Sequence, residues 1–330
     1  MKCPLGFGVS IPSFGLIYGK ITSVVYWWNL SMKQWNHDPR KLPWFDQPDA
    51  EQILARRRDS GALSDHTFAQ LENWLENGYI RVADMIDPRD IDEMNSDLES
   101  LWYESLVHDG LFLQDIKLPG KEPAQISHAE LMALDSETRL KIKTASNWRV
   151  FAFHNHSKAC CRIFHNVELK QLCSNLMGKS SLPTYTINFL YGSKQHIHQD
   201  SAVFHIYPMN HLIGVWLAGE DIVEESGPLV FYPKSHKAEP FTFTNYPQVN
   251  VKNASDNEYY AYGDYINSLA EQYDCAKYLP NKGELFIWHP LLVHGGSEII
   301  DPARTRKSYV CHYIAENCDQ SDSVAGPFRW

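Results

Sequence analysis

The sequence predicts a mainly β protein with flanking helices, in which N-terminal helices buttress a double-stranded β-helix (a jelly-roll or cupin-like barrel). Two observations predict this class. Helical patterns with clear start and stop signals occupy much of the chain before residue 180, and short runs of β-branched and aromatic residues separated by turns follow it. Helices followed by a series of short strands indicate an antiparallel double-sheet barrel rather than an alternating α/β fold.

Residues 1–60 are predicted to be an N-terminal extension that packs on the body of the protein. Lys20, two prolines and four glycines interrupt the apolar start of the chain. It therefore lacks both the continuous span of about 20 apolar residues that a transmembrane helix needs and the pattern of a signal peptide. Residues 31–60 are polar and contain three prolines, so we interpret them as an extended connector. Residues 61–330 are expected to form a single domain.

Helix signals are clearest in the first half of this domain. Ser64 is a suitable N-cap for a helix that Gly78 ends. Asp87 followed by Pro88 is a strong helix start, because proline fits the first helical position. Capping residues and helical spacing also predict helices at 127–134, where Ser127 and Glu130 form a capping box, and at 166–179. Residues 105–150 show a mixed pattern.

The second half predicts strands. They are the segments "TYTINFLY" (184–191), "AVFHIYP" (202–208), "LIGVWLAG" (212–219), "LVFYP" (229–233), "GELFIWH" (283–289) and "RKSYVCHYI" (306–314). Residues 237–280 form a long, tyrosine-rich insertion between two of these strands. Loops of that length usually contain hidden helices or carry function, and we expect a helix at 264–273.

Composition excludes several classes of protein. The chain has 330 residues, 44% of them hydrophobic, and a net charge of −10. It contains no basic run that could neutralise a phosphate backbone, so we expect no nucleic-acid partner. The seven cysteines are odd in number and include no C-x-x-C pair, which argues against a disulfide framework and predicts a cytoplasmic location.

The motif "HQD" is the first candidate for a metal site. His198 and Asp200 lie at the edge of a predicted strand, where residues two apart face the same side and can share one metal. An H-x-D alone is weak, since about one such match is expected by chance. The chain also contains an H-x-E at His128 and Glu130. That pair lies on a predicted helix, where i and i+2 face different directions, and the capping box already uses the glutamate.

A third ligand is needed, and "GELFIWHPLLVHGGSEII" offers His289 or His294. Two small residues follow His294, which favours it, because they let a ligand approach closely. Two histidines and one carboxylate leave three positions of a metal open, the arrangement of non-haem Fe(II) oxygenases. Such an iron needs an electron source to activate O₂, and a 2-oxo acid can supply it.

A 2-oxo acid needs a cation for its distal carboxylate, and arginine suits this best. Arg304 and Arg306 both follow the candidate ligands closely. Arg306 and Ser308 alternate onto one face of a predicted strand, so together they can bind one carboxylate.

With these residues identified, the chain from about residue 64 to 315 resembles the phytanoyl-CoA dioxygenase family of Fe(II)/2-oxoglutarate oxygenases. "LSDHTFAQLENWLENGYIRVADMIDPRDIDEM" resembles the N-terminal helix–strand–helix of that family. "HQD" matches its iron motif, "ESGPLVFYPKSHK" (225–237) its G-P-L and S-H segment, and "KGELFIWHPLLVHGGS" with "RKSYVCHY" its closing strands. Ser226 and Lys234 stand where the family pattern has Asn and Gly.

The resemblance implies that His198, Asp200 and His294 bind Fe(II), and that Arg306 and Ser308 bind the distal carboxylate of 2-oxoglutarate. It implies that residues 61–330 are one catalytic domain with an insertion at about 237–280. Family members that halogenate have Ala or Gly in place of the metal-binding aspartate, so the aspartate present here favours hydroxylation.

The resemblance also implies two further contacts to the co-substrate. Trp216 stands where the family has a tryptophan beside 2-oxoglutarate. The strand 184–191 is expected to supply a hydrogen bond from Thr186, Asn188 or Tyr191, and of these we favour Asn188.

The sequence thus predicts an Fe(II)- and 2-oxoglutarate-dependent dioxygenase that uses O₂ to hydroxylate an aliphatic C–H bond, with release of succinate and CO₂. The alternatives are a barrel that binds a metal without catalysis and a metal enzyme that needs no 2-oxo acid. The tyrosines and asparagines of the insertion favour a polar metabolite, an amino-acid derivative or a sugar derivative over an acyl-CoA. The tryptophans near the N-terminus are compatible with a homodimer.

Overall fold

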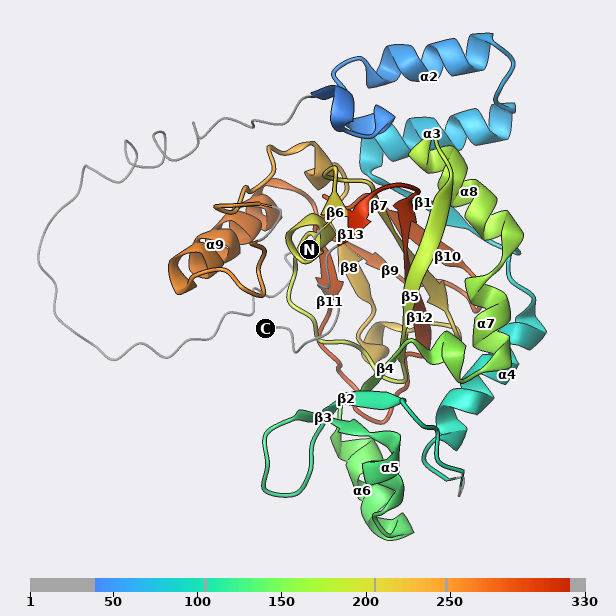
Figure 1. Cartoon of the computed structure of the whole chain (residues 1–330), viewed down its shortest axis with the longest axis vertical. Helices are drawn as coiled ribbons and strands as arrows, with labels where there is room; N and C mark the ends of the chain where they lie inside the picture. The colour runs from blue at the N-terminus through green and yellow to red at the C-terminus, as the bar shows by residue number, and fades with distance from the viewer. Residues whose placement is uncertain (1–38, 104–105, 205, 247–248, 321–330) are drawn as a thin grey trace, which may run out of the picture.

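The computed structural model of the chain describes residues 39–103, 106–204, 206–246 and 249–320. Its largest sheet has eight antiparallel strands in the order β1–β10–β7–β12–β5–β4–β2–β3 (Figure 1). These strands are β1 (Tyr79–Val82), β2 (Phe112–Ile116), β3 (Ala124–Ser127), β4 (Arg149–Phe151), β5 (Ser181–Phe189), β7 (Leu212–Ala218), β10 (Leu285–Trp288) and β12 (Ser308–Ala315).

Two smaller sheets accompany it. A three-stranded antiparallel sheet has the order β11–β8–β9, formed by β8 (Leu229–Phe231), β9 (Ala276–Tyr278) and β11 (His294–Gly296). A pair of short strands consists of β6 (Ile206–Tyr207) and β13 (Asp319–Gln320). The larger sheet is not closed into a complete barrel. The mainly β class with flanking helices is confirmed.

The helices lie largely before the central strands in the chain. They are α2 (Ala50–Asp59), α3 (Asp65–Asn77), α4 (Pro88–Ser100), α5 (His128–Met132), α6 (Ser136–Ala145), α7 (Lys158–Phe164), α8 (Val167–Met177) and α9 (Asp256–Gln272). The predicted boundary signals are confirmed: Ser64 caps α3, Gly78 ends it with a φ of 80°, and Asp87 caps α4. Ser127 and Glu130 form the capping box of α5.

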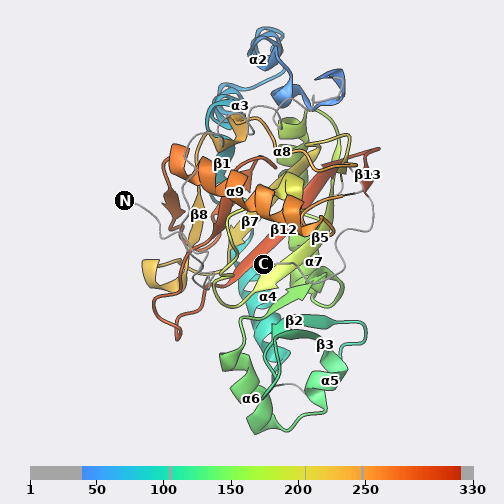
Figure 2. The ribbon, with the colours of Figure 1, turned by 90° about the vertical axis from the view of Figure 1, so that its left-hand side faces the viewer.

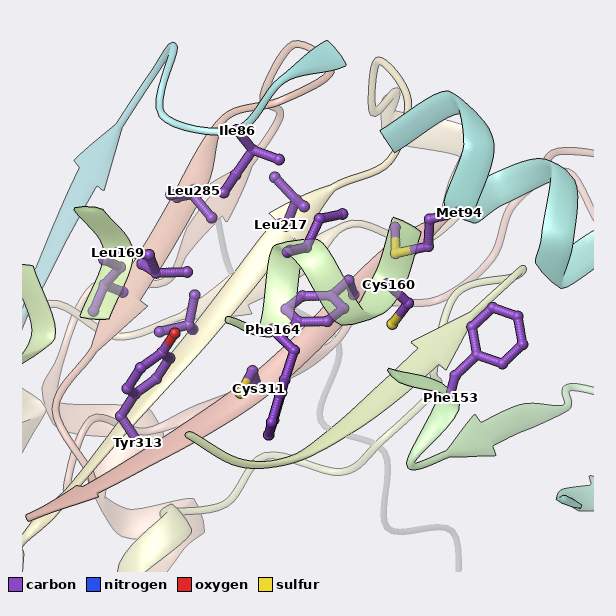
Figure 3. Packing of buried hydrophobic residues seen from close by; sticks show 14 of the residues in the cluster. Ile86, Met94, Phe153, Cys160, Phe164, Leu169, Leu217, Leu285, Cys311 and Tyr313 are labelled. Atoms are coloured by element: carbon purple, nitrogen blue, oxygen red, sulfur yellow. The ribbon is translucent and has the colours of Figure 1, made fainter. Parts of the chain in front are cut away.

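The central strands are buried on both faces. On β7, Ile213, Val215 and Leu217 point toward the helices and belong to the main hydrophobic core. Trp216, between them, points the other way and packs with residues of the smaller sheet. Figure 3 shows the helix-side packing, in which Cys311 and Tyr313 of β12 lie in the same core as residues of α4 and α7. This alternation leaves one face of the large sheet for helices and the other for a pocket.

Helices cover one side of the large sheet, and the insertion covers the other. In Figure 1, α4, α7 and α8 lie along one side of the strands and α9 lies on the opposite side. Figure 2, turned by 90°, shows α9 crossing in front of β5, β7 and β12. The helix predicted at 264–273 is confirmed as the second half of α9.

Two local predictions were wrong. The connector was predicted over residues 31–60, of which the structure describes 39–60; this part contains two short 3-10 turns (Pro39–Lys41 and Trp44–Asp46) and then α2. The strand predicted at 202–208 is reduced to β6, because a 3-10 turn, η4 (Asp200–Ala202), begins at the metal motif. The mixed region 105–150 contains three strands, β2, β3 and β4, which extend the large sheet at one edge.

The segment before α3 is attached to the body of the protein. The indole N–H of Trp44 donates to the carbonyl oxygen of Leu176 on α8 (2.7 Å), and Trp44 and Phe45 lie in the main core. The apolar start of the chain and the tryptophans that suggested a dimer fall in residues 1–38, outside the described residues. Within the described ranges, no helix combines the length and apolar character that crossing a membrane requires.

Candidate metal centre

His198, Asp200 and His294 come together, fully buried, between the two larger sheets. His198 and His294 form an isolated antiparallel bridge, with backbone N–H to O distances of 2.9 and 3.0 Å. Asp200 begins the 3-10 turn η4 immediately after this bridge. The bridge and the turn therefore bring residues almost 100 positions apart in the chain to one point.

The three side chains direct one ligand atom each toward the same space. Oδ1 of Asp200 lies 3.6 Å from Nε2 of His198 and 3.8 Å from Nε2 of His294. All three candidate ligand atoms lie within 4.8 Å of one another. Two imidazoles and one carboxylate fit a divalent transition metal, Fe(II) included.

Hydrogen bonds fix which ring nitrogen of each histidine is free to bind a metal. Nδ1 of His198 lies 2.7 Å from the His196 carbonyl oxygen, and Nδ1 of His294 lies 2.9 Å from the Leu292 carbonyl oxygen. A carbonyl oxygen only accepts, so Nδ1 carries the proton in both rings and Nε2 presents a lone pair. Each imidazole is therefore oriented as a ligand before any metal arrives.

The charge state of the group also suits a metal. Burial raises the pKa of Asp200, but the charges of His312 and His294 and the hydrogen bond from His312 outweigh it and hold that pKa well below its usual range. Burial lowers the pKa of His294 to about 4. At neutral pH the aspartate is ionised and His294 is neutral, as metal binding requires.

Sequence reasoning missed two side chains that contact Asp200. Its second oxygen, Oδ2, accepts hydrogen bonds from the indole N–H of Trp288 (2.8 Å) and from Nε2 of His312 (3.0 Å). The sequence analysis had identified His312 only as part of a strand. The sequence did contain a signal for His312. Residues 306, 308, 310 and 312 share one face of a strand, because side chains alternate with period two, so His312 faces the same side as Arg306.

Arg306 lies at the same pocket as the candidate ligands. The pocket is lined by Ile187, Phe189, Ser193, Gln195, His198, Asp200, Val203, Phe204, Trp216, Leu229, Trp288, His294, Arg306, Val310 and His312. Arg306 is 2% exposed, and burial lowers its pKa to about 10. Its guanidinium carbon lies 5.7 Å from the ring centre of Phe189 and 5.9 Å from that of Trp216. A buried cation held between two rings is costly unless an anion joins it.

Arg306 itself and two other residues offer buried donors. Nε of Arg306, Nε1 of Trp216 and Oγ of Ser308 are buried, and among the described residues none of these atoms has a hydrogen-bond partner. The only hydrogen bond of the guanidinium in the described part of the chain goes to the Gly227 carbonyl oxygen, at 3.4 Å. Buried donors are rarely left unpaired, so the group fits the carboxylate of a small ligand.

The structure does not bring Asn188 to this pocket. On β5, Ile187 and Phe189 face the pocket, and Asn188 points to the opposite, helix-covered face. There its amide nitrogen lies 3.3 Å from Sδ of Met94, and its oxygen lies 3.7 Å from Sγ of Cys160. The expectation that Asn188 binds the co-substrate is therefore corrected.

The two other residues considered on this strand are also directed elsewhere. Thr186 Oγ1 lies 3.2 Å from Nδ1 of His154. Tyr191 packs against the helix-side core. In their place the pocket offers Ser193 and Gln195, which follow the strand and which the sequence analysis did not consider.

The competing candidates, His289 and Arg304, lie apart from the three candidate ligands, and so does His236. His289 binds Asp46 (3.0 Å) and does not reach the metal centre. Arg304 is exposed and faces Asp301 at 3.7 Å. His236 lies beside the Leu75 carbonyl oxygen at 3.2 Å.

Two further histidines have hydrogen-bond partners of their own. Nδ1 of His211 lies 3.2 Å from the carbonyl oxygens of Pro208 and Met209. Nδ1 of His128 accepts the His108 N–H (3.0 Å). His205 falls outside the described residues.

The fold and site define a jelly-roll protein in which two histidines and one carboxylate that could hold a metal share one pocket with a buried arginine. The model of the phytanoyl-CoA dioxygenase (PhyH) family matches residues 74–307, well over half of the chain. The chain belongs to the phytanoyl-CoA dioxygenase family. The resemblance to this family seen in the sequence is thus confirmed.

Curated relatives match a limited part of their own length. Peroxisomal phytanoyl-CoA dioxygenase of Bos taurus is 31% identical over 134 residues, which are 39% of this chain and 36% of that protein. A phytanoyl-CoA dioxygenase domain-containing protein 1 homolog of Caenorhabditis elegans is 34% identical over 120 residues, 36% of this chain and 39% of that protein. The matched region spans little more than a third of these relatives.

Solved structures support the fold. EctD from S. alaskensis, solved with 2-oxoglutarate and 5-hydroxyectoine, has a TM-score of 0.54 at 14% identity over 77% of this chain and 76% of its own. SnoK, an α-ketoglutarate-dependent carbocyclase from nogalamycin biosynthesis, has a TM-score of 0.54 at 13% identity over 81% of this chain and 89% of its own. At such identities the likeness establishes the jelly-roll fold alone.

Proposed function

We propose that the protein is an active Fe(II)/2-oxoglutarate-dependent dioxygenase that hydroxylates an aliphatic C–H bond of a small molecule and releases succinate and CO₂. The observation that carries this proposal is that buried Arg306 lines the same pocket as His198, Asp200 and His294. A barrel that only binds a metal has no need of a buried cation beside it. A 2-oxo acid with a second carboxylate needs both the metal and the cation.

The residues present fit both Fe(II) and 2-oxoglutarate. Nε2 of His198, Nε2 of His294 and Oδ1 of Asp200 would hold the iron. When bound, iron(II) together with the 2-oxo acid supplies the redox chemistry with O₂ that side chains lack. The chain itself contributes ligand orientation, the position of the co-substrate and an environment poor in water.

Arg306 and Ser308 would bind the distal carboxylate of 2-oxoglutarate. The guanidinium offers a fixed fork of donors, and its place between Phe189 and Trp216 limits the directions it can take. With the distal carboxylate held at Arg306, the 2-oxo acid end of the molecule would share a pocket with the candidate ligands. Positioning of this kind lowers the entropic cost of bringing reactants together.

Apolar side chains form much of the remaining wall. They are Ile187, Phe189, Val203, Phe204, Leu229 and Val310. Such walls exclude water and strengthen the interaction of Arg306 with an anion, because the local dielectric is low.

The substrate is proposed to be a polar metabolite, an amino-acid derivative or a sugar derivative. A groove beside the pocket is lined by His196, Ile197, Val251, Tyr259, Tyr260, Tyr262, Gly263, Asp264, Ile266 and Asn267. His196 and Ile197 directly precede the first candidate ligand, and the tyrosines belong to α9. Aromatic faces with a few carboxylate, amide and hydroxyl groups suit a small polar molecule with an apolar part.

The proposal is tested by turnover of 2-oxoglutarate. Purified protein is supplied with Fe(II), 2-oxoglutarate and isotopically labelled O₂, and succinate and CO₂ are measured with and without a panel of small polar metabolites. We expect succinate formation that requires Fe(II), is lost in Asp200→Ala, and rises with a substrate that gains one labelled oxygen atom. Iron binding without any consumption of 2-oxoglutarate would contradict the proposal.

A cytoplasmic location is also proposed, on the sequence alone. Cell fractionation tests it. Recovery of the protein in an organelle fraction, such as the peroxisomes named for its bovine relative, would contradict it.

A further inference from the structure

Three residues form a row across the large sheet next to Asp200. Trp288 of β10 pairs with Gly214 of β7, and Gly214 pairs with His312 of β12. Directly paired residues of antiparallel strands point to the same face of the sheet. Trp288 and His312 therefore approach Asp200 from the two strands that flank β7, and Gly214 between them has no side chain.

Gly214 provides the space for this arrangement. A Cβ atom at this position would lie 2.0 Å from Cε2 and 2.2 Å from Cζ2 of Trp288. These distances are far below van der Waals contact, so any side chain on Gly214 would displace the indole. Glycine inside a strand is otherwise unfavourable, and it often marks close approach of a neighbouring group.

His312 is held by aromatic rings. Its ring centre lies 4.5 Å from that of Phe204, 5.6 Å from that of Tyr185 and 6.0 Å from that of Trp288. Because the ionised Asp200 only accepts hydrogen bonds, Nε2 of His312 carries the proton it donates. The indole of Trp288 has a single N–H, which is directed to Oδ2 of Asp200, the oxygen that His312 also contacts.

We propose that Trp288, Gly214 and His312 form a carboxylate clamp that makes Asp200 a metal ligand through Oδ1 alone. The clamp is Trp288 Nε1 and His312 Nε2 donating to Oδ2, with Gly214 as the gap between them. This inference rests on the function proposed above. Trp288 and His312 are positioning residues, since they act through Asp200 and do not themselves reach the metal.

The clamp has a chemical consequence. A carboxylate can bind a metal through one oxygen or through both. If Asp200 used both, it would occupy a position that the 2-oxo acid or O₂ needs, because a two-histidine, one-carboxylate site leaves only three positions open. With two donors on Oδ2, rotation of the carboxylate toward two-oxygen binding would break two buried hydrogen bonds, each of which is costly to leave unmade.

The test compares five variants in anaerobic titrations with Fe(II) and then with 2-oxoglutarate. Trp288→Phe keeps an aromatic ring and removes the donor. His312→Leu removes the other donor, and His312→Gln keeps an N–H group as the conservative variant. Trp102→Phe is the matched control, because Trp102 is a buried tryptophan of the helix-side core whose Nε1 has no hydrogen-bond partner in the described ranges.

We expect Trp288→Phe and His312→Leu to weaken Fe(II) binding about 10–100-fold, the usual effect of losing a group that orients a ligand. In the iron-saturated variants, 2-oxoglutarate should also bind more weakly and give a weaker or shifted visible charge-transfer band. His312→Gln should restore most of the affinity for Fe(II) and for 2-oxoglutarate, and Trp102→Phe should match the wild type. Gly214→Ala should resemble Trp288→Phe, because it displaces the same indole.

Two results would overturn the clamp. One is wild-type affinity for Fe(II) and 2-oxoglutarate in both donor-removing variants. The other is equal loss in His312→Gln and His312→Leu, which would mean that His312 acts by packing alone. If the wild type binds Fe(II) but no 2-oxoglutarate, the proposed function fails, and Fe(II) affinities of the variants still decide the clamp.

Discussion

The hydroxyl of Tyr262 on α9 accepts a hydrogen bond from the backbone N–H of Gln199, at 2.9 Å. Gln199 is the residue between the candidate ligands His198 and Asp200. Its side chain also donates to the Leu291 carbonyl oxygen, at 2.7 Å. The insertion is thus joined directly to the peptide that carries two ligands, and it is part of the frame of the metal centre.

Tyr262→Phe should lower both stability and metal affinity. The change leaves the buried N–H of Gln199 without a partner, which costs about 1–3 kcal/mol. We expect this loss in the free energy of unfolding measured with urea, and weaker Fe(II) binding. Tyr260→Phe is the control, since Tyr260 lies on the same helix and is 66% exposed. Equal behaviour of the two variants would show that α9 does not support the ligands.

Arg306→Ala should abolish useful binding of 2-oxoglutarate without removing the metal. Loss of one partner of a buried, hydrogen-bonded charge pair costs about 2–5 kcal/mol, roughly 30-fold or more in the dissociation constant. Arg306→Lys should recover part of the affinity, because it keeps the charge but not the planar fork. Calorimetry with Fe(II)-loaded protein measures both. Arg304→Ala, at an exposed position, should bind normally, and the opposite ranking of the two alanine variants would contradict the assignment.

Substitutions of His289 and His294 should have different effects: the first should lower stability, and the second should prevent metal binding. Nε2 of His289 lies 3.0 Å from Oδ1 of Asp46, and its Nδ1 accepts the Leu291 N–H (3.0 Å). His289→Leu should therefore lower the free energy of unfolding by about 1–3 kcal/mol and leave the metal stoichiometry unchanged. His294→Leu should lose the metal. Loss of iron from a folded His289→Leu variant would reverse the assignment.

Much of the metal centre could be predicted from the sequence, for a physical reason. His198 and Asp200 are close in the chain, so local geometry limits the distance between them. Arg306 could be predicted because the chemistry of a 2-oxo acid requires a cation. The third histidine had two candidates, and the bridge between His198 and His294 is what places His294 beside the other two candidate ligands.

The rest depended on pairing between distant strands. β5 is buried on both faces, so no polar alternation shows which of its residues face the pocket, and Asn188 was assigned to the wrong side. Trp288 and His312 meet at Asp200 only because β10, β7 and β12 are neighbours in a particular register. A single sequence contains no direct signal of that register.

His236 should make the stability depend on pH. Its side chain is 8% exposed, and burial, followed by the charge of His289, lowers its pKa to about 3. Asp46 and the Leu75 carbonyl oxygen oppose this shift, and Lys237 adds to it. Since the unfolded chain has a pKa near 6.5 at this residue, it binds more protons than the folded protein between these two values. This contribution to stability is complete above about pH 6.5 and is lost as the pH falls toward 3.

The measurement is urea unfolding at several pH values between 7 and 4, for the wild type and for His236→Gln. Glutamine keeps a donor for the Leu75 carbonyl oxygen and does not titrate. Below about pH 6, the wild type should lose up to about 1.4 kcal/mol per pH unit more than the variant. Parallel pH profiles would mean that His236 does not contribute to the acid sensitivity.

The central claim is that one pocket binds Fe(II) through His198, Asp200 and His294 and binds 2-oxoglutarate through Arg306. Its most direct test is anaerobic titration of the metal-free protein with Fe(II) and then with 2-oxoglutarate, observed by visible absorption. The account predicts a metal-to-ligand charge-transfer band that forms only when both are present and that is absent in His198→Ala and in Arg306→Ala. Iron binding without a band in the wild type, or an unchanged band in Arg306→Ala, would contradict it.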